Sequence, residues 1–134
     1  MTGRNRHSRE ELEACRDNVD ALLAAWQSNE VDDATLESLV FGQGVIALDA
    51  WFGHRPSDVQ GRDVDALVEV RVLADSIIGN GGTLRVRDST PWAAERTVLG
   101  LEVGDDVVVT ADGYERLAAA YFAALEKAFL EPRD

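Results

Sequence analysis

The side chains best suited to binding chemistry are two arginines near the middle of the chain. Arg85 and Arg87 alternate with Leu84 and Val86, so a strand here would present both guanidinium groups on one face. Two guanidinium groups side by side can hold a carboxylate or a phosphate, and Arg71 is a third candidate nearby. In a chain with 25 acidic residues, pairing with Asp or Glu in solvent is the commoner outcome for such arginines.

The glycine-rich stretch over 79–82 invites comparison with a phosphate-binding loop. Such a loop runs from a strand into a helix, so that backbone amides and the helix N-terminus face the anion. Here the expected order is reversed, because a helix precedes the glycines and a strand follows them. We therefore expect a helix C-cap and a turn.

The sequence contains no pattern of nucleophiles or metal ligands. Cys15 lies on the apolar face of an expected helix, which is typical of a small core residue and not of a nucleophile. His54 has no second histidine or cysteine nearby, so we expect no metal site. Ser, His and Asp occur without the spacing of a nucleophile elbow or a triad. We predict no catalytic residue, no metal ion and no cofactor.

The net charge of the chain indicates which kinds of partner it can bind. Thirteen basic and 25 acidic residues give a formal net charge of −12. Such a field keeps a protein in solution and repels nucleic acid and anionic membrane surfaces. It indicates either an acidic face for a basic partner or a general acidic surface, as in proteins adapted to a salty cytosol. The acids are spread along the chain without forming a block, which favours the second interpretation.

Length, cysteine content and hydropathy point to one domain in the cytoplasm. A single cysteine rules out an internal disulfide and suits a reducing compartment. No apolar run reaches about 18 residues, so we expect no membrane-spanning segment. Residues 1–7 are basic and expected to be flexible, and the charged helix after them differs from a secretory signal. We predict one globular domain over 8–134.

The spacing of apolar residues predicts a helix over 8–26, with a capping box at its start. A short helix over 34–40 is expected next, and the two glycines of 41–44 are expected to interrupt it. The β-branched, apolar run over 45–48 then predicts a short buried strand. A second helix that reaches Trp51 is the alternative.

The segment over 63–78 has the apolar period of a helix, and Asp63 can cap it. Residues 68–72 alternate equally well as a strand, so both structures stay open, although the cap and the glycine stop favour the helix. The remaining predicted elements are a strand over 83–87, a helix over 92–99, a short strand over 107–110 and a last helix from Asp112.

Six short segments occur along the chain in this order: Glu30-Val31-Asp32, Val45-Ile46-Ala47-Leu48-Asp49, Asp63-Val64-Asp65-Ala66-Leu67, Gly81-Gly82-Thr83-Leu84-Arg85-Val86, Ser89-Thr90-Pro91 and Leu99-Gly100-Leu101. Together they resemble a STAS domain of the anti-anti-sigma type over about residues 30–125. The resemblance implies a small α/β fold that binds a partner protein, often a kinase-like anti-sigma factor. That family's switch is a phosphorylated serine at the start of its central helix. Here Val64 and Asp65 stand in that place, so no serine inherits the role.

Two other families share shorter segments with the chain. Ala25-Trp26-Gln27-Ser28-Asn29, Gly61-Arg62-Asp63 and Tyr121-Phe122 are similar to cone-shaped α+β enzymes of the SnoaL and limonene-epoxide-hydrolase kind. Ala123 stands where those enzymes have an aspartate. Separately, Thr110-Ala111-Asp112-Gly113 resembles the strand-to-helix exit of winged-helix regulators. The net charge argues against unaided DNA binding, because phosphate contacts supply most of that affinity.

These observations predict a small single-domain α/β fold, a sheet with packed helices and an N-terminal helix, with the α+β cone as the alternative. The predicted function is a non-catalytic regulatory module that binds another protein. A small enzyme or ligand-binding cone and a winged-helix transcriptional regulator are the alternatives. We expect no nucleic-acid or membrane partner, and a homodimer is compatible with the sequence. The predicted partner surface consists of Asp63, Asp65, Arg85 and Arg87.

Overall fold

The computed structural model describes residues 9–30, 32–52, 66–86 and 92–127, and this part of the chain is built from helices. They are α1 (Arg9–Gln27), α2 (Ala34–Phe52), α3 (Ala66–Gly79), the short 3-10 helix η2 (Ala94–Arg96) and α4 (Ala111–Leu125). In these ranges β pairing is limited to an isolated antiparallel bridge between Thr83 and Asp106. The predicted α/β fold is therefore wrong for the described residues. The cone-shaped alternative fails for the same reason, since it requires a curved sheet.

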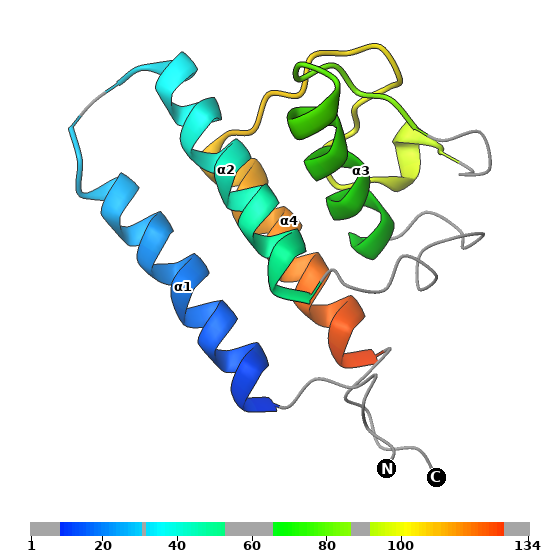
Figure 1. Cartoon of the computed structure of the whole chain (residues 1–134). Coiled ribbons are helices and arrows are strands. Elements are labelled where there is room, and N and C mark those ends of the chain that lie inside the picture. The colour runs from blue at the N-terminus through cyan, green and yellow to red at the C-terminus, as the bar shows by residue number, and fades with distance from the viewer. Residues whose placement is uncertain (1–8, 31, 53–65, 87–91, 128–134) are drawn as a thin grey trace, which may run out of the picture.

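The helices pack around α2 and α4. Figure 1 shows α2 between α1 and α3, with α4 behind it, and α4 contacts all three. Phe41 of α2 lies at the centre, fully buried, with its ring 5.7 Å from that of Trp26 on α1 and 5.1 Å from that of Tyr114 on α4. Among the described helices, none is long and apolar enough to cross a bilayer.

Helix α1 confirms the predicted N-terminal helix over its described residues. Its buried residues recur at three- and four-residue steps: Leu12, Cys15, Val19 and Leu23. Arg9 and Arg16 reach the carboxylate of Glu126, at 3.2 and 3.1 Å, so the start of α1 is tied to the end of α4. Burial of Cys15 confirms its interpretation as a small core residue.

Helix α2 corrects the sequence prediction, because it runs unbroken through the segment expected to hold an interruption and a strand. Asp33 caps it, its Oδ1 accepting hydrogen bonds from the amides of Thr35 and Leu36 at 3.0 and 3.1 Å. Gly44 does not break the helix. A Cβ at this position would lie 2.9 Å from the ring of Tyr114, so the glycine lets α2 and α4 approach closely.

Helix α3 settles the ambiguity over 63–78 in favour of a helix, described from Ala66 onward. The following glycines form a C-cap and turn, as predicted. The amides of Asn80 and Gly82 both donate to the carbonyl of Ser76, at 3.1 and 3.0 Å. Gly81 and Gly82 have φ values of 65° and 88°, which only glycine adopts readily.

The predicted strands over 83–87 and 107–110 are wrong in their described residues, which form no ladder. Leu84 donates from its amide to the carbonyl of Asp105 at 2.8 Å and accepts from the amide of Gly104 at 2.9 Å. β-branched residues favour extended backbone, but a strand also needs a hydrogen-bonded neighbour along its length.

The predicted helix over 92–99 is reduced to η2. The hydroxyl of Thr97 donates to the carbonyl of Ala94 at 2.7 Å, which closes the short turn. Beyond it, the amides of Val98 and Leu99 donate to the side chain of Glu69 and not to helix carbonyls. The last predicted helix is confirmed as α4.

The two glycines of α2 provide a matched test of this packing. Replacing Gly44 with alanine would place Cβ 2.9 Å from Tyr114 and 3.2 Å from Leu22. We expect overpacking to outweigh the gain in helix propensity, with a net loss of about 1–2 kcal/mol in the free energy of unfolding. Gly42→Ala is the control, because its Cβ meets only Ile77, at 3.6 Å. Urea unfolding followed by circular dichroism should separate the two variants, and equal effects would contradict this packing.

Candidate functional site

The predicted partner surface is represented by one described residue. Asp63, Asp65 and Arg87 lie outside the described residues, so their grouping with Arg85 stays a prediction. Arg85 is exposed, and its backbone is held by the buried Ser76. The hydroxyl of Ser76 accepts from the Arg85 amide at 3.1 Å and lies 3.3 Å from the Arg85 carbonyl, to which it can also donate. Arg71 forms an ion pair with Asp49 of α2 at 2.9 Å.

The most unusual polar residue is Glu69, a carboxylate buried in α3 with 1% of its surface exposed. Its Oε1 accepts from the Val98 amide at 2.8 Å and its Oε2 from the Leu99 amide at 2.9 Å. Arg116 of α4 donates to the Val98 carbonyl at 3.3 Å. Burial raises the pKa of Glu69, while the two backbone hydrogen bonds and the charge of Arg116 oppose that rise.

Glu69 has a perturbed pKa, which is a common property of catalytic groups, but its contacts favour a structural role. Both carboxylate oxygens are engaged by backbone amides of the chain itself. They connect α3 to a segment that has little secondary structure of its own. The sequence signal was a single glutamate between Val68 and Val70 in an apolar-periodic segment, and the sequence prediction gave it no role.

Two further side chains connect α2 to the start of α4. Glu37 Oε2 accepts from the Ala111 amide at 2.7 Å, and Ser38 Oγ accepts from the Val109 amide at 3.1 Å. A carboxylate at a helix N-terminus pairs with a free amide and with the positive end of the helix dipole. These polar groups therefore position α2 against α4.

The described residues contain no cluster suited to catalysis or metal binding. No group of three or more His, Cys, Asp or Glu side chains among them could hold a metal ion. Burial raises the pKa of Cys15 to about 12, so its sulfur is a thiol and not a nucleophilic thiolate. Every buried side-chain nitrogen or oxygen in the described part has a hydrogen-bond partner.

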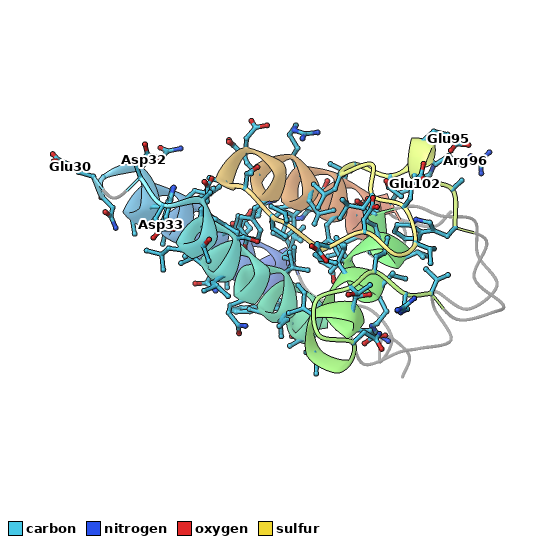
Figure 2. All side chains as sticks on the ribbon, turned by 90° about the horizontal axis from the view of Figure 1, so that it is seen from above. Glu30, Asp32, Asp33, Glu95, Arg96 and Glu102 are labelled. Atoms are coloured by element: carbon cyan, nitrogen blue, oxygen red, sulfur yellow. The ribbon has the colours of Figure 1, made fainter. Side chains whose placement is uncertain are left out.

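The feature that packing leaves unexplained is one side of α2, which we call the α2 face. It consists of the exposed residues Leu36, Leu39, Gln43, Ala47, Ala50 and Trp51. They recur at the three- and four-residue steps that place side chains on one side of a helix. Leu39 is 62% exposed, Trp51 40% and Leu36 38%. Figure 2 shows α2 and α4 on opposite sides of the crowded core side chains, so the far side of α2 faces solvent.

The α2 face combines three large exposed apolar side chains with the absence of any charged residue. On α1, the exposed positions include Glu10, Glu13, Asp17 and Asp20. Other large exposed apolar side chains come singly from separate segments: Ile78, Val103 and Val108. Isolated residues of that kind are normal, whereas several large apolar side chains on one face of a helix make that face the candidate interaction surface.

The charges around this face are unevenly distributed. Glu30, Asp32 and Asp33 are exposed and lie together beside the start of α2 (Figure 2). Glu95, Arg96 and Glu102 lie at the opposite end of the molecule in the same view. Among the residues that the structure describes, Glu30 and Asp32 have no hydrogen bond or ion pair.

No protein-family model, curated protein or solved structure matches this chain. The fold that the STAS resemblance implied is contradicted by the described helices. Among the described residues, the α2 face is therefore the strongest candidate for a functional site.

The role of Glu69 can be tested through pH. Its pKa is raised in the folded protein from the ordinary value of 4.5, so its contribution to stability is complete below the unfolded pKa. That contribution is lost as pH rises through the folded pKa. We expect the difference in unfolding free energy between wild type and Glu69→Gln to shrink as the pH rises from 4 through the folded pKa of Glu69. Urea unfolding at a series of pH values measures this difference.

At every pH, Glu69→Gln should also lower stability by about 1–3 kcal/mol, because a glutamine amide cannot accept from both backbone amides. Glu95→Gln is the control, since Glu95 is exposed. A wild-type advantage over Glu69→Gln that stays constant with pH would show that this carboxylate is not the titrating group.

Proposed function

We propose that this protein is a non-catalytic interaction module that binds another protein through the α2 face. The observation that carries the proposal is an exposed, uncharged, largely apolar helix face on a chain with a net charge of −12. Removing apolar surface from water favours association by roughly 25 cal/mol per Å², before the entropic costs of binding are subtracted. Because the face has no charged side chain, its burial requires no charge to be desolvated.

The other polar groups support a binding role more than an enzymatic one. Glu69, Ser76, Glu37 and Ser38 all hold one part of the chain against another. The enzyme alternative required a curved sheet around a cavity, and the described residues contain no sheet. The single cysteine is compatible with the cytoplasmic location that we include in the proposal.

The winged-helix alternative has less support. A DNA-reading helix needs an exposed face with basic or amide side chains. The resemblance lies at the start of α4, and the one basic residue of α4, Arg116, pairs with Asp112 at 3.1 Å. An acidic surface also opposes the phosphate contacts that supply affinity for DNA.

Charge substitutions on the α2 face test the proposal. We expect Leu39→Glu and Ala47→Glu each to abolish retention of a partner, because each places a carboxylate in the centre of the apolar contact. Val103→Glu is the matched control. It adds the same charge at an exposed apolar position outside α2. The measurement is quantitative mass spectrometry of proteins retained by each immobilised variant, after circular dichroism has shown that all are folded.

The proposal requires a defined protein that is retained by wild type and by Val103→Glu and is lost with both face variants. If the face variants retain the same proteins as wild type, the α2 face is not the contact surface. A DNA duplex retained by wild type at low salt would instead favour the regulator alternative.

A further inference from the structure

We infer that the occupant of the α2 face is a single amphipathic helix of another protein, with an apolar stripe flanked by Lys or Arg. This inference rests on the proposed function and identifies the class of partner. The length of the face is the first argument. Leu36 and Trp51 mark its ends, and the rise of about 1.5 Å per residue makes it about 22 Å long. A partner helix of about four turns covers this length.

The width of the face also suits one helix. The α2 face is presented by a single helix, and Ala47 and Ala50 are short beside Leu39 and Trp51. Short side chains let a second helix approach to the usual axis separation of about 8–10 Å. Large apolar residues of the partner would pack over the alanines, between Leu39 and Trp51. This is the helix-on-apolar-surface mode of peptide recognition.

Area argues against a second copy of this chain as the occupant. The largest exposed apolar patch of a typical monomer is about 300–600 Å², whereas a stable complex between two globular proteins buries about 800 Å² on each partner. A lone helix needs less, because it can bury most of its own apolar stripe on the face.

Charge complementarity indicates that the partner carries positive charge. Glu30, Asp32 and Asp33 lie beside the start of α2, and the first two have no partner among the described residues. A second copy would bring another chain of −12 and another acidic rim to the contact. Lys or Arg on the partner would instead be attracted to this rim, with its basic end beside Glu30 and Asp32. Attraction of this type raises the association rate and weakens with added salt.

The test uses two synthetic helical peptides of about 16 residues with the same leucine stripe. One carries Lys and Arg on its flanks and the other carries Glu. We expect the basic peptide to bind wild type, by fluorescence anisotropy at low salt, and to bind Leu39→Glu about tenfold more weakly. The acidic peptide should not bind.

A rim variant separates specific attraction from the general acidity of the chain. Glu30→Gln/Asp32→Asn removes two charges beside α2 and keeps the helix cap at Asp33. We expect it to bind the basic peptide about three- to fivefold more weakly, with a smaller salt dependence. Glu95→Gln/Glu102→Gln is the control, because it removes the same charge at the opposite end of the molecule (Figure 2) and should bind like wild type.

Four results would overturn the inference. Equal binding of the two peptides, or equal loss with both double variants, would show that charge beside α2 does not select the partner. Binding of neither peptide would exclude a single helix. A wild-type dimer in sedimentation equilibrium that Leu39→Glu dissociates would make the occupant a second copy. That last result would leave the α2 face as the contact surface, so it differs from failure of the proposed function.

Discussion

The buried carboxylate of Glu69 is the interaction on which the non-helical part of the structure depends. The segment after η2 has backbone amides that neither a helix nor a sheet satisfies, and buried amides without partners are costly. Glu69 accepts from two of them, and Arg116 reaches the Val98 carbonyl from α4. Burying a carboxylate is itself unfavourable, so this arrangement holds only while both oxygens are hydrogen-bonded. Glu69 thus connects α3 to the segment after η2, and Arg116 connects that segment to α4.

The other polar side chains of the interior are also engaged in hydrogen bonds to the backbone, so few of them are available for catalysis. Glu37 and Ser38 complete the backbone hydrogen bonding before and at the start of α4, and Ser76 does so for the chain after α3. In the described part, no buried side-chain nitrogen or oxygen is left without a partner. The α2 face is apolar but is not buried by packing within the described residues, which makes it the candidate for function.

The sequence predicted α1 and α4, whose periodicity has one clear buried face, favoured a helix for α3 while leaving a strand open, and wrongly divided α2. Helix α1 alternates core and charged positions, and α4 has a cap and a buried stripe. Helix α2 is apolar on nearly every side, and its glycines suggested a break although Gly44 serves close packing against Tyr114. Because the sequence prediction divided α2 into a helix and a strand, it did not place Leu39 and Trp51 on one helix face. Glu69 was missed because its partners, Val98 and Leu99, are about thirty residues away in the chain.

The position of the charges favours an acidic face for a basic partner over a general acidic surface. A general acidic adaptation would place carboxylates on every exposed helix surface, since it acts through hydration and not through position. Exposed acids lie on α1 between Glu10 and Asp20, whereas the α2 face has none over about four turns. We interpret the absence of charge on the α2 face as a sign that this face is desolvated in a complex. We propose that contact with an apolar partner causes this desolvation, and that the acidic rim beside the start of α2 selects a partner of opposite charge.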